Sequence, residues 1–303
     1  MGVEAAQVRI GVSGWRYADW RGGFYPPGLT QAQELSFASR QVPAVELNGS
    51  FYSLQRPASY QRWATETPDG FVFTVKGPRF VTHLLRLRNA EVALANFFAS
   101  GVLALGTKLG PLLWQLPPNM PFDEPLLDAF LAQLPRDTHA ALALARRRDP
   151  ARMAGKEWLG PVEPLRLRHA LEVRHASFCQ PQTVDLLRRH GVALVAADAP
   201  GDWPEVGDVT ADFVYVRLHG AQQLYASGYT DAQLATWAER IRAWAVGSAP
   251  ADMARLSNEP AAPAPAAHNV FCFFDNTGQS HAPRDALTLA RKLALHEQLQ
   301  IPS

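Results

Sequence analysis

The feature that most constrains this sequence is a series of eight short apolar runs, each of which stops at polar or glycine residues. Such runs are typical of buried strands. Helical patterns lie between most of them, and alternation of strand and helix predicts a parallel sheet with right-handed crossovers. Eight such units predict an α/β fold, a single (β/α)8 barrel of the TIM type, with an open doubly wound sheet as the alternative. In chain order the runs are 8–15, 44–52, 71–83, 110–118, 169–178, 192–200, 212–220 and 269–276.

The segments between the runs carry helix signals of unequal strength. Residues 181–191 begin with proline and end with basic residues and glycine, which is a matched start and stop signal. Residues 231–247 place apolar side chains on one face of a helix. Residues 201–211 are too short and too rich in Gly, Pro and Asp for a full helix. We therefore expect a shortened sixth β-α unit.

Length and composition favour one domain. The chain has 303 residues, of which 47% are hydrophobic, and a barrel of this size is ordinary. We expect a single barrel domain over residues 1–303. Residues 145–166 form one predicted insertion, between the fourth and fifth strands. A second insertion, residues 248–268, precedes the eighth strand and is rich in Ala and Pro, a composition that predicts disorder.

Charge and short motifs exclude several classes of protein. The net charge is +1, so the overall balance does not indicate a nucleic acid or membrane partner. We find no span-length apolar stretch and no signal peptide, and the expected location is the cytoplasm. The two cysteines form no Cys-x-x-Cys pair, so neither a disulfide framework nor a zinc knuckle is indicated. No phosphate-binding glycine motif is present, and no organic cofactor is expected.

Polar side chains occupy the ends of seven of the eight predicted strands. In a barrel of this type these ends meet at the C-terminal face, where active sites form. Burial of one such charge without a partner is costly, so a shared polar site explains the set. The residues are Glu46 and Asn48, Lys76 with His83 beyond it, Gln115, Glu172 with Arg174 and His175, Asp198, Arg217 and His219, and Asp275 with Asn276.

Two carboxylates and two histidines are the candidate catalytic groups. Glu46 and Glu172 could flank a substrate as general acid and base, or as acid and nucleophile. His83 and His219 could exchange protons near neutral pH. The alternative is a structural ring of ion pairs, in which Glu172 holds Arg217 or Lys76.

The remaining polar and aromatic residues are candidates for substrate binding. Lysine and arginine side chains would hold phosphate or carboxylate. Aromatic side chains after the strands could stack on sugars or unpaired bases, or could only pack the loops. The candidates are Lys76, Arg174, His175, Arg217, Asn48, Tyr52, Trp15, Gln115, Asp198, Asp275 and Asn276.

Seven motifs distributed along the chain resemble those of the domain of unknown function 72 family, the YecE-like proteins. They are GVSGWRYADWRGGFYP, VELNGSFY, VKGPRFVTH, KLGPLLWQLPP, LEVRHASF, FVYVRLHG and FFDNTGQSHAPRDA. The resemblance covers about residues 10–293 and implies a TIM-type barrel, but it implies no established activity. The family's asparagine pair on the last strand is Asp275-Asn276 here, and its NSTFY motif is NGSFY. The first difference adds a negative charge to the predicted site.

The leading functional hypothesis is an enzyme that acts on a small polar or phosphorylated substrate by acid–base chemistry, with hydrolysis as the reaction class. A non-catalytic protein that binds nucleic acid or a metabolite is one alternative. A metal-dependent phosphoesterase or nuclease is another, because histidine and carboxylate side chains suit a divalent ion. No His-x-His or His-Glu-x-x-His motif supports that metal site, and the prediction is that no metal is bound. We expect no membrane partner, and the sequence leaves the oligomeric state open.

Overall fold

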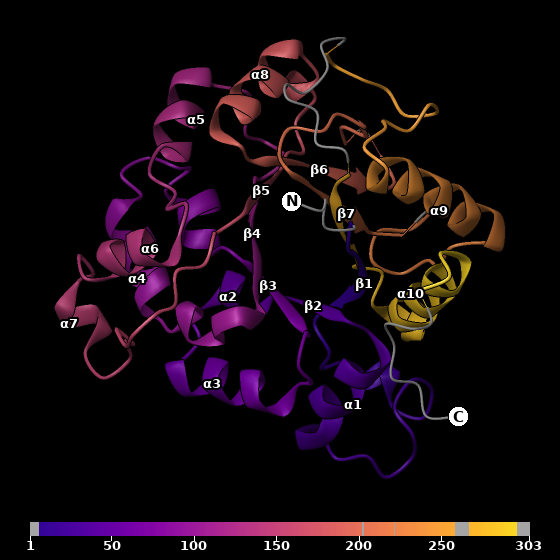
Figure 1. The fold of residues 1–303 in the computed structure, drawn as a ribbon, viewed down its shortest axis with the longest axis horizontal. Helices are drawn as coiled ribbons and strands as arrows, with labels where there is room; N and C mark the ends of the chain where they lie inside the picture. The colour runs from indigo at the N-terminus through magenta and orange to yellow at the C-terminus, as the bar shows by residue number, and fades with distance from the viewer. Residues whose placement is uncertain (1–5, 202, 221, 258–266, 296–303) are drawn as a thin grey trace, which may run out of the picture.

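The computed structural model describes residues 6–201, 203–220, 222–257 and 267–295, and it is a closed barrel (Figure 1). Eight parallel strands follow one another around the barrel in chain order, and β8 pairs with β1 to close it. This confirms the predicted TIM-type fold. The strands are β1 Val8–Ser13, β2 Ala44–Leu47, β3 Val72–Lys76, β4 Leu109–Gln115, β5 His169–Glu172, β6 Ala193–Asp198, β7 Phe213–Leu218 and β8 Asn269–Phe274.

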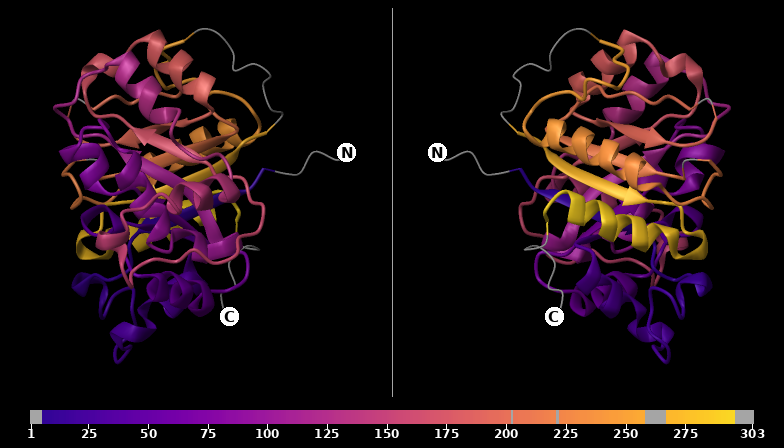
Figure 2. Two further views of the ribbon diagram at one scale, coloured as in Figure 1. Left: turned by 90° about the vertical axis from the view of Figure 1, so that its left-hand side faces the viewer. Right: turned by 90° about the vertical axis from the view of Figure 1, so that its right-hand side faces the viewer.

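Helices cover the outside of the barrel. In Figure 2, α9 and α10 lie against the outer face of β8. As predicted, no helix occurs between β6 and β7 in the part of residues 199–212 that the structure describes. The helices are α1 Glu34–Gln41, α2 Gly49–Tyr52, α3 Pro57–Glu66, α4 Glu91–Ala99, α5 Glu124–Leu131, α6 Thr138–Ala145, α7 Pro150–Met153, α8 Pro181–His190, α9 Asp231–Ala245 and α10 His281–Lys292.

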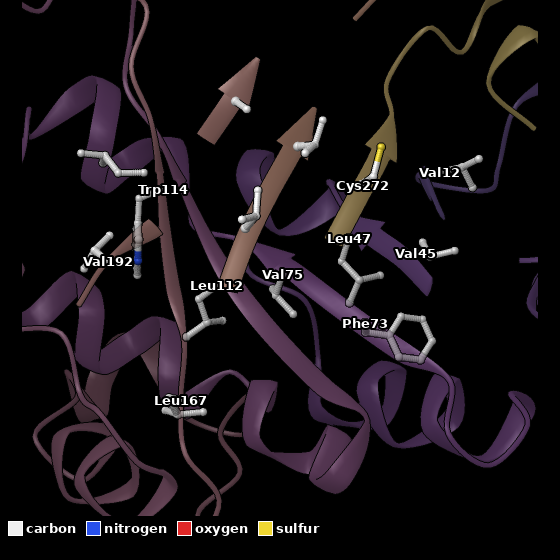
Figure 3. Close-up of a cluster of buried hydrophobic side chains, with 14 of the residues drawn as sticks. Val12, Val45, Leu47, Phe73, Val75, Leu112, Trp114, Leu167, Val192 and Cys272 are labelled. Carbon is white, nitrogen blue, oxygen red and sulfur yellow. The ribbon is translucent and has the colours of Figure 1, made fainter. Parts of the chain in front are cut away.

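Side chains alternate between two hydrophobic clusters because successive residues of a strand point to opposite faces. Along β7, Phe213 and Tyr215 belong to the cluster inside the barrel, whereas Val214 and Val216 belong to the cluster under the helices. Figure 3 shows part of the outer cluster, in which Trp114 of β4 is labelled. The same alternation turns Arg217, the next inward position of β7, toward the barrel axis at its C-terminal end.

Three of the expected runs and one expected insertion differ from the structure. In the third and fifth runs the strands end at Lys76 and Glu172, and helical turns follow over Phe80–Leu84 and Ala176–Phe178. The second apolar run is not one strand over residues 44–52, because β2 ends at Leu47 and the next residues form α2. The insertion expected to be disordered, residues 248–268, is packed at its start: Met253 is buried, and Ala254 pairs with Val206. Asp208 accepts hydrogen bonds from the backbone just beyond. Residues 258–266 of the insertion lie outside the described residues, and His268 at its end is buried.

None of the helices in the described ranges is both long enough and apolar enough to cross a bilayer.

Candidate functional site

Arg217 is the centre of a buried charge cluster at the carboxyl ends of the strands. Its Nε and Nη2 donate to the two oxygens of Glu46 at 3.0 and 2.7 Å. Its Nη1 donates to Glu172 Oε2 at 2.5 Å, and Nη2 also donates to Asp275 Oδ2 at 2.9 Å. The guanidinium is fully buried. One arginine therefore joins three carboxylates from β2, β5 and the end of β8.

Both carboxylate oxygens of Glu46 accept hydrogen bonds from neighbouring side chains. Ser13 Oγ donates to Oε1 at 2.9 Å, and Tyr215 OH donates to Oε2 at 2.6 Å. Thr74 Oγ1 lies 2.9 Å from the same tyrosine hydroxyl. With Arg217 included, four hydrogen bonds hold a fully buried carboxylate. Protonation of Glu46 by a substrate would cost several of these bonds, so this geometry fits a structural role better than an acid–base role.

Glu172 is also held by positive charge. Arg174 Nε donates to its Oε1 at 2.7 Å, and Arg217 holds its other oxygen. Burial by itself would raise the pKa of Glu172, but the charges of Arg174, Arg217 and His219 outweigh burial and hold that pKa well below its usual range. Asp275 behaves in the same way, since Arg217 and His219 lower its pKa against the effect of burial. Neither group is a proton donor at neutral pH.

We expect the protein to lose stability as the pH falls below about 4. The pKa values of Glu172 and Asp275 are lower in the folded protein than in the unfolded chain. Their contribution is therefore complete above the unfolded pKa values and is lost as the pH falls toward the folded ones. Urea unfolding at pH 7, 4 and 3 measures this. A free energy of unfolding that stays constant over that range would contradict the lowered pKa values.

His219 lies beside this cluster under two aromatic side chains. Its Nδ1 is 3.1 Å from Asp275 Oδ2 and its Nε2 is 3.6 Å from Glu172 Oε2. The rings of Trp203 and Tyr225 contact the imidazole edge to face, with centroid distances of 5.2 and 5.6 Å. These residues come from the loops after β6 and β7. Trp203 was not predicted, although the rule that selected Trp15, an aromatic residue just after a strand, also selects Trp203.

Lys76, at the end of β3, is the charged group without a partner. Its side chain is buried, with 7% exposed, and Nζ lies 4.2 Å from the ring centroid of Phe51. Within the described residues, Nζ makes no hydrogen bond or ion pair. Burial and the positive charge of Arg217 lower the pKa of Lys76 to about 8, although the neighbouring carboxylates oppose this change. A substantial fraction of this amine is therefore neutral near physiological pH.

His83 also contacts Phe51 and lies in a π-helical segment over Phe80–Leu84. Its ring meets Phe51 edge to face at 5.1 Å, and its Nε2 is 3.5 Å from Gln115 Nε2. Burial lowers the pKa of His83 to about 4, with further lowering from the charges of Lys76 and neighbouring arginines. The imidazole is therefore neutral at pH 7. Phe51 therefore contacts both Lys76 and His83, and His83 lies beside Gln115.

Two predicted site residues face away from the cluster. Asp198 Oδ2 accepts a hydrogen bond from Trp237 Nε1 of α9 at 3.0 Å, because the side chain follows inward-facing Ala197 and points outward. Asn276 Nδ2 donates to Asp285 Oδ2 of α10 at 2.9 Å. Both side chains therefore attach helices to the barrel, and the structure does not place them with the proposed substrate-binding groups.

Four other predicted residues lie at the periphery. His175 Nδ1 accepts a hydrogen bond from the backbone N–H of Ser177 at 3.2 Å, which caps a short 3-10 turn. Trp15 and Asn48 line a separate hollow of about 290 Å³. Asn48 Oδ1 is buried there with no hydrogen-bond partner among the described residues. The side chain of Tyr52 is 72% exposed and borders a different cleft.

The donor set does not form a metal site in the part of the chain that the structure describes. No group of three or more His, Cys, Asp or Glu side chains is arranged to hold an ion there. The three carboxylates that come closest together all bond to Arg217. A metal ion would have to displace that guanidinium.

Comparison with known proteins identifies the family. The family described as "Protein of unknown function DUF72" matches residues 9–303. The chain belongs to the DUF72 family. Two solved members share the fold: a protein from Thermotoga maritima with a TM-score of 0.67 and 24% identity, and one from Enterococcus faecalis with a TM-score of 0.66 and 17% identity. The match covers 95% of this chain in each case, and 99% and 96% of those chains.

Curated relatives of this DUF72 protein match over a shorter stretch. UPF0759 protein YunF of Bacillus subtilis is 31% identical over 116 residues, which is 37% of this chain and 40% of YunF. UPF0759 protein YecE of Escherichia coli is 30% identical over 129 residues, which is 42% of this chain and 44% of YecE. The match therefore spans less than half the length of these relatives. None of these descriptions states an activity, so function must be inferred from the site.

Proposed function

We propose that this protein is an enzyme that acts on a small anionic substrate by acid–base chemistry at the carboxyl ends of the strands, with the amine of Lys76 exchanging the proton. The observation that carries the proposal is a buried, unpaired amine beside a charge cluster. Lysine serves as a general base when burial and a neighbouring cation lower its pKa toward neutrality. Both conditions hold at Lys76.

The carboxylates take a supporting role in this proposal. Glu46 and Glu172 both bond to Arg217, and the pKa of Glu172 is too low for a general acid at neutral pH. We therefore assign the proton exchange to Lys76 and not to the expected pair of carboxylates, Glu46 and Glu172. Hydrolysis is not retained as the reaction class, because that expectation depended on the pair. Arg217 shares its single positive charge among Asp275, Glu46 and Glu172, and Arg174 supplies a second positive charge beside them.

Arg174 is the candidate group for binding the anion. Its guanidinium stacks on Trp203 at 3.8 Å from the ring centroid, which holds it in one orientation. Nη2 lies 2.6 Å from Glu172 Oε1, yet it makes no aligned hydrogen bond with any described residue. Because Nε and Nη2 both face Glu172 Oε1, Nη1 is the nitrogen that could donate to a phosphate or carboxylate. The positive charge of Lys76 is one of the causes that lower the pKa of His83, after burial, so the two groups interact electrostatically.

Ligand screening tests the proposed function. Thermal unfolding is measured with phosphate, sugar phosphates and 2-oxo acids, and consumption of each hit is followed by NMR. A ligand at about a hundredfold over its Kd should stabilise by roughly 2.7 kcal/mol and raise the Tm by several degrees. Lys76→Met should retain binding and lose turnover. The proposal is wrong if Lys76→Met turns over substrate at the wild-type rate. It is also wrong if the protein consumes none of the ligands that it binds.

The protonation of Lys76 can be checked without a substrate. We expect its reaction with acetic anhydride, followed by peptide mass spectrometry, to reach half its maximum near pH 8. Exposed Lys156 serves as the accessibility reference. Because the pKa is lowered on folding, the unfolded chain binds this proton more tightly, and stability relative to Lys76→Met should rise between pH 8 and about 9.5. A difference that is flat or falls with pH would contradict the lowered pKa.

A further inference from the structure

A basic and aromatic cleft lies beside the strand ends, outside the charge cluster. It has a volume of about 630 Å³ and is formed by α2 and the residues after it, the segment after β3, α4 and α7, which occupy one side of the barrel in Figure 1. Phe51 belongs to its wall and also contacts Lys76, so the cleft adjoins the proposed active site. Most of the wall is nonetheless outside the barrel mouth.

The charge of this cleft is unbalanced. Four exposed cations line it: Arg56, Arg79, Arg152 and Lys156. Their side chains make no ion pair or hydrogen bond with any residue that the structure describes, and no Asp or Glu is among the lining residues. The whole chain carries a net charge of only +1, so this local excess of four cations does not reflect the overall charge balance. Four unpaired cations exceed what one phosphate or carboxylate would neutralise, which favours a ligand with several phosphates.

Exposed rings border the same cleft. Tyr52 from α2 is 72% exposed, and Phe80 from the π-helical segment is 40% exposed. The guanidinium of Arg152 lies over the Phe80 ring, with Cζ 5.9 Å from its centroid. Apolar side chains of this size are normally covered, and an exposed group of them marks a binding surface. Aromatic rings interleaved with arginines are typical of proteins that stack unpaired bases and neutralise the phosphates between them.

We infer that this cleft binds single-stranded nucleic acid, with the phosphates on the four cations and bases stacked on Tyr52 and Phe80. A duplex fits less well because its bases are already stacked and cannot reach the rings. An acidic peptide would form ion pairs with the four cations, but it would not supply planar groups to stack on Tyr52 and Phe80. Binding here does not depend on the chemistry proposed for Lys76, so each can fail without the other.

Fluorescence anisotropy tests this with the full chain and a labelled oligothymidylate of about twelve nucleotides. Four phosphate contacts predict a slope of roughly −3 for log K against log salt concentration, at about −0.7 for each contact. The double variant Arg79→Gln, Arg152→Gln should reduce that slope by about half. Tyr52→Ala and Phe80→Ala should each weaken binding about tenfold with the slope unchanged.

Arg255→Gln is the matched control, because Arg255 is exposed and unpaired among the described residues and lies in the segment that packs beside Val206, away from the cleft. It should bind as the wild type does. Absence of binding at low salt would overturn the inference, as would an equal loss in Arg255→Gln. Binding of a duplex or of polyglutamate as tightly as the oligothymidylate would also overturn it and would indicate a general polyanion or acidic-peptide surface.

Discussion

Replacement of Arg217 by methionine should lower the free energy of unfolding by about 3–5 kcal/mol, the cost of removing one partner from a buried ion pair. Arg217 holds Glu46, Glu172 and Asp275 in the barrel interior, where water does not replace it. Methionine fills most of the volume but leaves three buried carboxylates without their shared cation. Urea unfolding at pH 7, followed by circular dichroism, measures the loss.

Arg189→Met is the control that removes one positive charge at the protein surface. Arg189 is 53% exposed and pairs with Glu124 at 2.8 Å on the surface. Its removal should cost less than about 1 kcal/mol. The cost of Arg217→Met should also shrink below about pH 4, where the stranded carboxylates become protonated. Equal losses in the two variants, or a loss in Arg217→Met that does not change with pH, would show that the cluster does not stabilise the fold as argued.

Replacement of Trp114 by alanine should also cost about 3–5 kcal/mol, as expected for a fully buried tryptophan. Its ring packs edge to face against Phe97 of α4 and Phe130 of α5, with centroid distances of 5.8 and 5.5 Å. Its Nε1 also donates to His169 Nδ1 at 3.1 Å. The substitution therefore removes contacts between two helices and β4, whose next residue is Gln115 of the site. The midpoint and slope of urea unfolding give the loss.

Trp114→Phe separates packing from the hydrogen bond. Phenylalanine keeps most of the ring contacts but leaves His169 Nδ1 without its donor, which should cost about 1–3 kcal/mol. A loss as large as that of Trp114→Ala would mean that the hydrogen bond, and not the packing, dominates at this position.

Most of the fold could be predicted because its signals are local. Strand runs and helix caps depend on residues close in sequence, and 181–191 and 231–247 became α8 and α9 nearly to the residue. The shortened sixth unit was also predictable, since residues 201–211 are few and rich in Gly, Pro and Asp, and the described part of this segment holds no helix. The second run was less clear, because Gly49–Tyr52 is apolar enough to extend a strand and yet forms α2.

The site was predictable as a set of positions but not as a set of interactions. Position at a strand end selected Lys76, Glu172 and Arg217 correctly as neighbours, but it also selected Asp198. Successive side chains of a strand alternate between the barrel interior and the helices outside. The last side chain therefore faces inward only if it is an even number of residues from another inward-facing one. One residue separates inward Ala197 from outward Asp198, and boundaries read from sequence are not accurate to one residue.

By itself, the sequence determined the order of the strands and helices and the end of the barrel at which polar groups gather. Only the tertiary structure decided which charges neutralise one another. Arg217 takes three carboxylates from three strands, and Lys76 is left with an aromatic ring as its neighbour. The physical reason is that strand and helix signals act over a few residues along the chain. Charge pairing depends on distances across the closed barrel between residues up to 171 positions apart.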